Sequence, residues 1–323
     1  MGDILHALPA VTALRQAHPS WYVGWAVEPR WRPLLCVDRI HLVNAKEWAR
    51  SPLRGQTLRE IGDLRRELRT ERYDLCVDLQ GAVRSALVGR LSGASRLIGE
   101  DQPREWAARW IFGERVPTKG VHVIEQAMEV CSAVAGDRLS PLLPPLPVNR
   151  EAERWADEVL GGEQKRPVVL LSPGAGWGAK RWPAERYGAV ASDLHHYGCL
   201  VLVNAGPEER AIAAEVMLAS GGVALAPEFT LERLIALSRR ISLLIAGDTG
   251  PLHLACALGK PVVGIYGPTD PKRNGPFGVP FRVLRHPESK RDHTRHTEPE
   301  AGLLTITPEQ VFAAARELLL EVR

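Results

Sequence analysis

Residues 242–267 constrain the fold of this chain more than any other stretch. The stretch opens with the apolar run 243–246, and short continuous runs of this kind are typical of parallel strands that are buried on both faces. A glycine-rich turn follows at 247–250, and then come a short apolar helix that begins at Pro251 and a second strand at 262–266. This order of strand, loop, helix and strand predicts an α/β fold with a parallel sheet.

The loop after the first of these strands, 247–253, is a candidate ligand site. In open α/β sheets, ligands bind beyond the carboxyl ends of the strands, where the free amides at a helix start attract anions. The loop is therefore expected to bind phosphate. Asp248 is expected to hold hydroxyl groups instead, and the alternative is that Asp248 caps the helix, since aspartate is a favoured N-cap.

The rest of the chain repeats the alternation of strand and helix on both sides of a proline cluster at 141–147. Proline cannot continue a helix, so the cluster marks a linker. A chain of 323 residues is also longer than a usual single domain. We therefore predict two Rossmann-like, doubly wound domains, 1–147 and 148–323, that face each other across a cleft. The last helix, 308–322, is amphipathic and can pack back on the first domain.

Composition and charge exclude several classes of protein. A hydrophobic content of 45% and a charged content of 24% fit a soluble globular protein, and a net charge of +3 is too small to indicate a nucleic-acid partner. The five cysteines form no C-x-x-C pair, which is typical of buried thiols in a reducing cytosol. The sequence predicts neither a membrane span nor a secretory signal.

The printed sequence opens with an unusual first element. Apolar residues at 4, 5, 8, 11 and 14 follow Met1-Gly2-Asp3 at helical spacing, so a helix is expected first. An α/β domain normally opens with a strand. Our hypothesis is that Met1 is an internal methionine, that translation starts upstream, and that the first strand of the domain is missing from this sequence.

A second loop, 172–183, leaves a buried strand and enters a helix. Its alternate glycines let backbone amides approach a ligand, and Lys180 adds a point charge, so the loop predicts a phosphate cradle. The spacing fits neither the dinucleotide fingerprint nor a P-loop. The alternative is a flexible loop with a solvated lysine.

No metal site is expected. The chain contains no D-x-D pair, the motif that would present magnesium to a nucleotide sugar. Lys180 and the amides at a helix start must therefore stabilise the negative charge of the leaving group. His286, His293 and His296 lie among charges and turns, which indicates a solvated segment instead of a metal site.

Polar groups also follow the strands of the first half. Gln80 ends a buried strand at 73–79, and Arg84 opens the next helix. Asp3 lies at the front of the first helix, where its carboxylate is able to accept a proton from an acceptor hydroxyl. The alternative role for Asp3 is again a helix cap.

Four motifs occur in order along the chain: MGDILHALPA (1–10), DLQG with Arg84-Ser85 (78–85), GAG with KRWP (174–183) and GDTGPLH (247–253). Together they resemble the bacterial ADP-heptose:lipopolysaccharide heptosyltransferases of glycosyltransferase family 9. The resemblance implies a GT-B fold with an acceptor-binding first domain and an ADP-sugar-binding second domain. It also implies inversion at the anomeric carbon by a single displacement, with no metal or other cofactor.

The resemblance implies roles for individual residues. Asp3 matches the general base, Lys180 a catalytic phosphate ligand and Asp248 the contact to the heptose hydroxyls. Further donor contacts are expected from Gly176 in the glycine loop, from Glu208 or Glu209 at the ribose and from Phe229 beside the adenine. The pyrophosphate loop is expected to contribute Thr249, Gly250, Leu252 and His253. Acceptor contacts are expected from Glu28, Gln80, Arg84 and Arg104, because the acceptor carries anionic groups; the alternative for the arginines is a solvated surface charge.

The HALP version of the first motif and the GWGAK loop are more similar to heptosyltransferase I than to type II. The resemblance thus implies transfer of heptose from ADP-heptose to the Kdo of Kdo-lipid A, and we expect a monomeric, cytoplasmic enzyme that is peripheral on the inner membrane and binds no nucleic acid. Alternatives are a type II-like family member with another acceptor or sugar, and a non-catalytic nucleotide-sugar-binding protein, suggested by the missing strand. A nicotinamide oxidoreductase fits least, because no G-x-G-x-x-G follows a strand.

Overall fold

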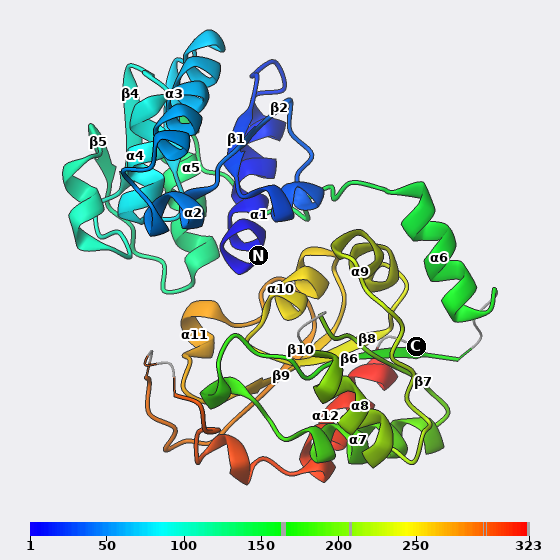
Figure 1. Cartoon of the computed structure of the whole chain (residues 1–323). Coiled ribbons are helices and arrows are strands. Elements are labelled where there is room, and N and C mark those ends of the chain that lie inside the picture. Colours follow the sequence, from blue (N-terminus) through cyan, green and yellow to red (C-terminus); the bar gives the residue numbers. More distant parts are fainter. Residues whose placement is uncertain (163–165, 207–208, 293, 295, 322–323) are drawn as a thin grey trace. The chain divides into compact units, whose positions relative to one another are not determined.

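The computed structural model describes residues 1–162, 166–206, 209–292, 294 and 296–321. The chain divides into two compact units, Asp3–Pro147 and Val148–Arg323. Residues 139–149, which include the proline cluster, contain no helix or strand. Each unit is described by itself below (Figure 1).

The first unit alternates helices with parallel strands. It begins with helix α1 (Gly2–Ala17), which confirms the predicted opening helix. The further elements are β1 (Gly24–Val27), the 3-10 helix η1 (Pro29–Leu34), β2 (Arg39–Leu42), α2 (Ala45–Arg50), α3 (Gly55–Thr70), β3 (Leu75–Asp78), α4 (Val83–Leu91), β4 (Arg96–Glu100), the 3-10 helix η2 (Trp106–Trp110), β5 (Glu114–Val116) and α5 (Val123–Ala135).

The strands of the first unit form two separate parallel sheets among the described residues, β1–β2 and β3–β4–β5. Strands β1 and β3 are therefore edge strands. Only Val27 is buried in β1 and only Asp78 is buried in β3. The sheet of this unit is thus interrupted between β1 and β3. A Rossmann-like domain has one continuous sheet instead.

The second unit has a single continuous sheet. Its elements are α6 (Arg150–Leu160), β6 (Val168–Ser172), η3 (Gly178–Lys180), α7 (Ala184–His196), β7 (Leu200–Val203), α8 (Arg210–Ala219), α9 (Leu231–Ser238), β8 (Leu243–Gly247), α10 (Gly250–Ala257), β9 (Val262–Tyr266), α11 (Pro271–Asn274), β10 (Phe281–Arg285), η5 (Leu303–Thr305) and α12 (Pro308–Glu321). The strand order is β10-β9-β8-β6-β7, and all pairs are parallel.

Helices cover both faces of this sheet. Figure 1 shows α9 and α10 on one side and α7, α8 and α12 on the other, so the unit is doubly wound. Every residue of β6, β7, β8 and β9 is buried, as their continuous apolar runs predict. Helix α12 packs on α7 and on β8, β9 and β10, so it belongs to the core of the second unit.

The segment after β9 contains the short helix α11. Asp270 caps the short helix α11, because its carboxylate accepts a hydrogen bond from the Lys272 N–H at 2.9 Å. Proline at the first helical position needs no N–H partner, so Pro271 continues into a helical turn.

Candidate functional site

The candidate site of the second unit lies where the order of the strands reverses. The chain passes from β6 outward to β7, and then returns to β8 on the other side of β6. Ligands of doubly wound sheets bind at such a switch point, beyond the carboxyl ends of the two strands. The loops that leave β6 and β8 carry Lys180 and Asp248, two of the charged groups predicted for this domain.

Lys180 and Asp248 form a buried ion pair. The Lys180 Nζ lies 2.5 Å from the Asp248 Oδ2, and the two side chains are 10% and 8% exposed. The Lys180 ammonium also lies 4.3 Å from the centre of the Trp177 ring, which is a cation–π distance. The alternative of a solvated lysine on a flexible loop is therefore wrong.

His253 completes this cluster from the first turns of α10. Its Nε2 lies 3.2 Å from the Asp248 Oδ1, so each carboxylate oxygen of Asp248 has a partner. Burial alone raises the pKa of Asp248, but the hydrogen bond and charge of His253 and the charge of Lys180 outweigh burial and hold that pKa well below its usual range. The carboxylate therefore stays ionised at neutral pH.

The helix cap predicted as the alternative role of Asp248 is wrong. Thr249 is the N-cap of α10 and makes no capping hydrogen bond through its side chain; its hydroxyl donates to the Gly247 carbonyl at 3.3 Å instead. The amides of the first turn, which begins at Gly250, are thus not occupied by a capping side chain and are suited to an anion. The side chain of Leu252 is fully buried, so only its backbone can serve a ligand.

The glycine loop between β6 and α7 is held by backbone hydrogen bonds to the segment 296–300. The Ala179 N–H donates to the His296 carbonyl at 3.1 Å, and the Glu300 N–H donates to the Ala179 carbonyl at 3.2 Å. A Cβ on Gly178 would lie 1.6 Å from the Thr297 carbonyl oxygen, so glycine is required for this close approach. The loop that carries Lys180 is therefore fixed by the segment 296–300.

Glycine also makes room for Glu209 beside this loop. A Cβ on Gly174 would lie 2.0 Å from the Glu209 Oε1, and the Glu209 Oε2 accepts a hydrogen bond from the Gly206 N–H at 3.1 Å. No Cβ clash exists at Gly176, which has open space within 4 Å. Glu208, the other residue predicted to contact ribose, lies outside the described residues.

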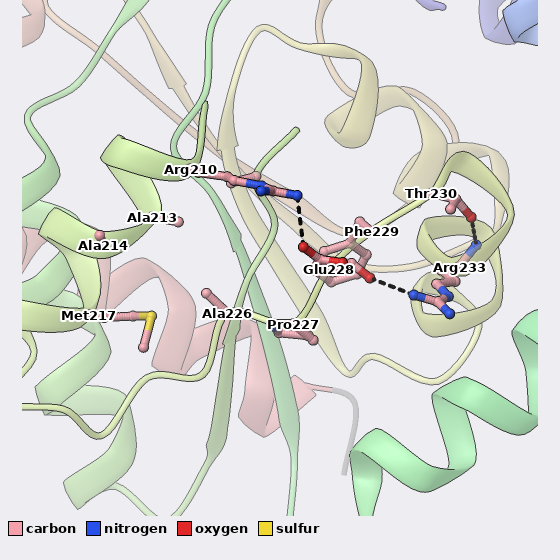
Figure 2. A pocket seen from close by; sticks show the side chains of 11 residues that line it. Arg210, Ala213, Ala214, Met217, Ala226, Pro227, Glu228, Phe229, Thr230 and Arg233 are labelled. Carbon is pink, nitrogen blue, oxygen red and sulfur yellow. Dashed lines mark hydrogen bonds and ion pairs between the residues drawn. The ribbon is translucent and has the colours of Figure 1, made fainter. Parts of the chain in front are cut away.

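Phe229 lines a pocket of about 320 Å³ between α8 and the segment 226–233. In Figure 2, Ala213 and Met217 of α8 lie on one side of the pocket and Phe229 on the other. The Arg210 Nη2 lies 2.7 Å from the Glu228 Oε1 at its rim. The predicted sites included only Phe229 of this lining. Arg210, Met217 and Arg233 were missed, because residues of helix α8 and helix α9 carry no motif that links them to Phe229.

The candidate site of the first unit is built around Asp3. Its Oδ2 accepts hydrogen bonds from the Gln80 Nε2 at 2.8 Å and from the Arg104 Nη1 at 3.2 Å. The Asp3 side chain remains 52% exposed, so a hydroxyl group can still reach it. Asp3 lies in the first turn of α1, whose N-cap is Met1, so the predicted alternative of a cap is wrong.

A tight turn after β3 brings these three residues together. The Asp78 Oδ1 accepts hydrogen bonds from the N–H groups of Gln80 and Gly81, both at 2.8 Å. Gly81 has φ of +66°, and a Cβ there would lie 2.9 Å from the Arg104 backbone nitrogen. Glycine thus lets the Arg104 segment approach the turn, and the Glu105 N–H donates to the Gly81 carbonyl at 2.8 Å.

Two predicted acceptor residues, Glu28 and Arg84, do not contact Asp3 in the described structure. The Glu28 Oε2 accepts a hydrogen bond from the Arg30 Nε at 2.9 Å, and Arg84 lies exposed in the first turn of α4. In the part of the chain that the structure describes, no hydrogen bond or ion pair links either residue to Asp3. Asp78, which sequence reasoning did not assign, supports the site through the turn.

No group of three or more His, Cys, Asp or Glu residues among the described ones is arranged to hold a metal ion. The His296 Nε2 pairs with the Asp292 Oδ2 at 3.0 Å, while His293 lies outside the described residues. None of the described helices combines the length and the apolar character that a membrane span requires.

Comparisons with known proteins identify the family. The model of glycosyltransferase family 9 (heptosyltransferase) matches residues 61–303. The chain is 28% identical over 291 residues to lipopolysaccharide heptosyltransferase 1 of Pseudomonas aeruginosa, covering 86% of this chain and 79% of that protein. It is also 28% identical over 349 residues to lipopolysaccharide heptosyltransferase 2 of Escherichia coli K12, covering 99% and 96%.

Solved structures show the same fold. A family 9 glycosyl transferase from Veillonella parvula superimposes with a TM-score of 0.83 at 22% identity, covering 99% of this chain and 94% of that one. The E. coli heptosyltransferase WaaC with ADP superimposes with a TM-score of 0.78 at 24% identity, covering 100% and 97%. The predicted GT-B class, with two Rossmann-like units, is confirmed.

The family model covers most of the chain, and the predicted relationship is confirmed by both sequence and fold. This chain belongs to glycosyltransferase family 9, the heptosyltransferase family, and is a glycosyltransferase enzyme.

Proposed function

We propose that this enzyme transfers a heptose from ADP-heptose to the Kdo of the lipopolysaccharide inner core, with inversion at the anomeric carbon. The buried cluster of Lys180, Asp248 and His253 at the switch point of the second unit carries the proposal. A cation and free helix amides suit a diphosphate, and an ionised carboxylate suits sugar hydroxyls. The named relatives are lipopolysaccharide heptosyltransferases, and one solved relative is described with ADP.

The donor is assigned to the second unit. The Lys180 ammonium has three N–H donors, so it can keep Asp248 as a partner and still contact the β-phosphate of ADP. The adenine is assigned to the pocket that Phe229 lines, and the ribose to Glu209. Negative charge develops on the departing phosphate, and Lys180 with the first amides of α10 stabilises that charge.

Asp3 is assigned as the general base. It accepts the proton of the acceptor hydroxyl as the hydroxyl oxygen bonds to the anomeric carbon, while the bond from that carbon to the phosphate oxygen breaks and ADP leaves. Gln80 and Arg104 orient the carboxylate through its Oδ2. Arg104, Arg84 and Glu28 are proposed to contact the anionic acceptor.

The experiment is ADP release from ADP-heptose with Kdo-lipid A as acceptor. We expect Asp3→Ala to abolish transfer and to leave the affinity for ADP-heptose within about twofold, because Asp3 belongs to the acceptor side. Asp63→Ala is the matched control, since Asp63 is an exposed aspartate that pairs with Arg66 on the surface of α3. Normal turnover by Asp3→Ala would remove Asp3 from the mechanism.

The type of acceptor is tested by the same assay. Relatives of type 1 and type 2 match this chain at equal identity, and the motif at 6–9 with the loop at 176–180 favours type I. We therefore expect the rate of ADP release to be higher with Kdo-lipid A as acceptor than with the same acceptor that already carries one heptose. The reverse order would assign type II. Binding of ADP-heptose without release by either acceptor would indicate a non-catalytic binding protein.

We further propose that the enzyme acts as a monomer without a metal ion, on the cytoplasmic face of the inner membrane. Addition of EDTA is expected to leave the rate of ADP release unchanged, because Lys180 supplies the positive charge at the phosphate. A rate that falls with EDTA and recovers with magnesium would contradict the metal-free reaction.

A further inference from the structure

We infer that η2 of the first unit is a contact surface for an anionic lipid bilayer, made by Trp106 and Trp110 together with Arg109. The inference rests on the proposed function, because an acceptor that is anchored in a membrane must be met at the surface of that membrane.

The two tryptophans of η2 point to solvent. Trp106 is 61% exposed and Trp110 is 68% exposed, whereas Ala108 between them is fully buried. Ala108 packs with Ala86 of α4 in one apolar cluster, so it anchors the inner side of the 3-10 helix. The opposite side therefore presents two large indole rings, whose exposure costs free energy unless something covers them.

Arg109 joins the two rings. Its guanidinium lies 5.9 Å from the centre of the Trp106 ring and 5.7 Å from that of Trp110, and the rings themselves are 5.6 Å apart in an edge-to-face arrangement. Tryptophan is enriched at membrane interfaces, where its ring is buried and its N–H stays wet. The Arg109 Nη2 also lies 3.1 Å from the Asp101 Oδ1, so Arg109 orders the rings, and the unpaired cations of the surrounding segment are the ones that can bind lipid phosphates.

The charge of the surrounding segment favours an anionic partner. Residues 83–119 hold seven Lys and Arg residues but only four Asp and Glu, while the whole chain has 41 and 38. The segment therefore carries a net charge of +3. Four of its arginines, at 96, 104, 109 and 115, pair with carboxylates, whereas Arg84, Arg90 and Lys119 are exposed and form no ion pair among the described residues. Positive charge concentrated beside exposed aromatic rings distinguishes a lipid headgroup surface from a neutral protein partner.

The surface continues into the candidate acceptor site. Arg104, which contacts Asp3, lies two residues before Trp106, and the Glu105 side chain accepts a hydrogen bond from the Val83 N–H at 2.9 Å. The segment that presents the tryptophans is thus attached to the turn that orients Asp3. Contact of η2 with a bilayer would hold Asp3 near hydroxyl groups at the membrane surface.

The test is co-sedimentation of the full chain with vesicles that contain no acceptor, so its result does not depend on sugar transfer. One set of vesicles is equimolar phosphatidylcholine and phosphatidylglycerol, and the other is phosphatidylcholine alone. We expect binding to the anionic vesicles that salt weakens, and about tenfold weaker binding by the double variant Trp106→Ala/Trp110→Ala. The double variant Leu218→Ala/Leu320→Ala, which removes two exposed leucines of the second unit, is the control and should bind as the wild type does.

Two further measurements keep the outcome clear. Thermal unfolding verifies that the tryptophan variant is folded, and transfer to a lipid-free fragment of the acceptor should stay at the wild-type rate. Wild-type protein that does not bind anionic vesicles, or a tryptophan variant that binds them equally well, overturns the inference. A wild-type dimer that the tryptophan substitutions dissociate would assign the surface to a second copy and would also overturn it.

Discussion

The Lys180 ammonium lies 2.5 Å from the Asp248 carboxylate, and both side chains are buried beside the sheet of the second unit. Breaking a buried ion pair leaves an uncompensated charge, which typically costs about 3–5 kcal/mol. We expect Lys180→Met to lower the free energy of unfolding by roughly 3 kcal/mol, measured with urea. Lys272→Met is the control, because Lys272 is exposed in α11. Equal loss in both variants would contradict the role of the pair.

Asp248 should make stability depend on pH in one direction. Its pKa is held well below the usual range in the folded chain, because His253 and Lys180 outweigh the opposing effect of burial. Its contribution is therefore full above the unfolded pKa of about 3.9 and is lost as pH falls toward the folded pKa. Urea unfolding of the wild type and of Asp248→Asn should differ most near neutral pH, and the difference should shrink below about pH 4. A constant difference would refute this linkage.

Asp78 should act in the opposite direction. Burial raises the pKa of the Asp78 carboxyl, although Ser85 and the N–H groups of Gly81 and Gln80 oppose the rise. The folded chain thus binds the proton more tightly than the unfolded chain, and the wild type gains stability relative to Asp78→Asn as pH falls from 7 toward about 4. Paired urea titrations across that range measure the gain. A relative stability that falls with decreasing pH would show that the pKa of Asp78 is lowered.

Gly178 should tolerate no side chain. A Cβ there would meet the Thr297 carbonyl oxygen at 1.6 Å, so the backbone must shift and carry Lys180 with it. Gly178→Ala is expected to lose at least about 2 kcal/mol of stability and to weaken ADP binding. Gly176→Ala is the matched control for stability, because no atom lies within 4 Å of its Cβ position. Similar unfolding midpoints for the two variants would show that the contact at Thr297 is dispensable.

Phe229 should contribute to nucleotide affinity. Its ring lines the pocket between α8 and the segment 226–233, where it can pack on a base. Phe229→Ala is expected to raise the Kd for ADP about tenfold, measured by calorimetry, since aromatic stacking is worth about 1–3 kcal/mol. Phe281→Ala is the control, because Phe281 is 43% exposed in β10 and does not line the pocket. An unchanged Kd in Phe229→Ala would place the base elsewhere.

The inner strands and most helices of the fold could be predicted from residue patterns, whereas helices α2, α9 and α11 were not predicted. Strands β6, β8 and β9 are continuous apolar runs, and burial on both faces makes such runs unmistakable. Strands β2, β5 and β10 were missed. These three strands lie at sheet edges and are partly exposed, so they admit charges such as Glu114 and Arg115 of β5 and Arg282 of β10, and their sequences lack that signal.

The sequence by itself determined the α/β class, the family and the two glycine loops, because strand burial and close backbone approach restrict residue type locally. Only the tertiary structure decided which charges meet. Asp3 pairs with residues 77 and 101 positions away, and Lys180 pairs with a residue 68 positions away. Such pairs depend on the order of the strands in a sheet and on the close approach of loops at Gly81 and Gly178. A local sequence pattern does not encode the distance between two side chains that only the folded sheet brings together.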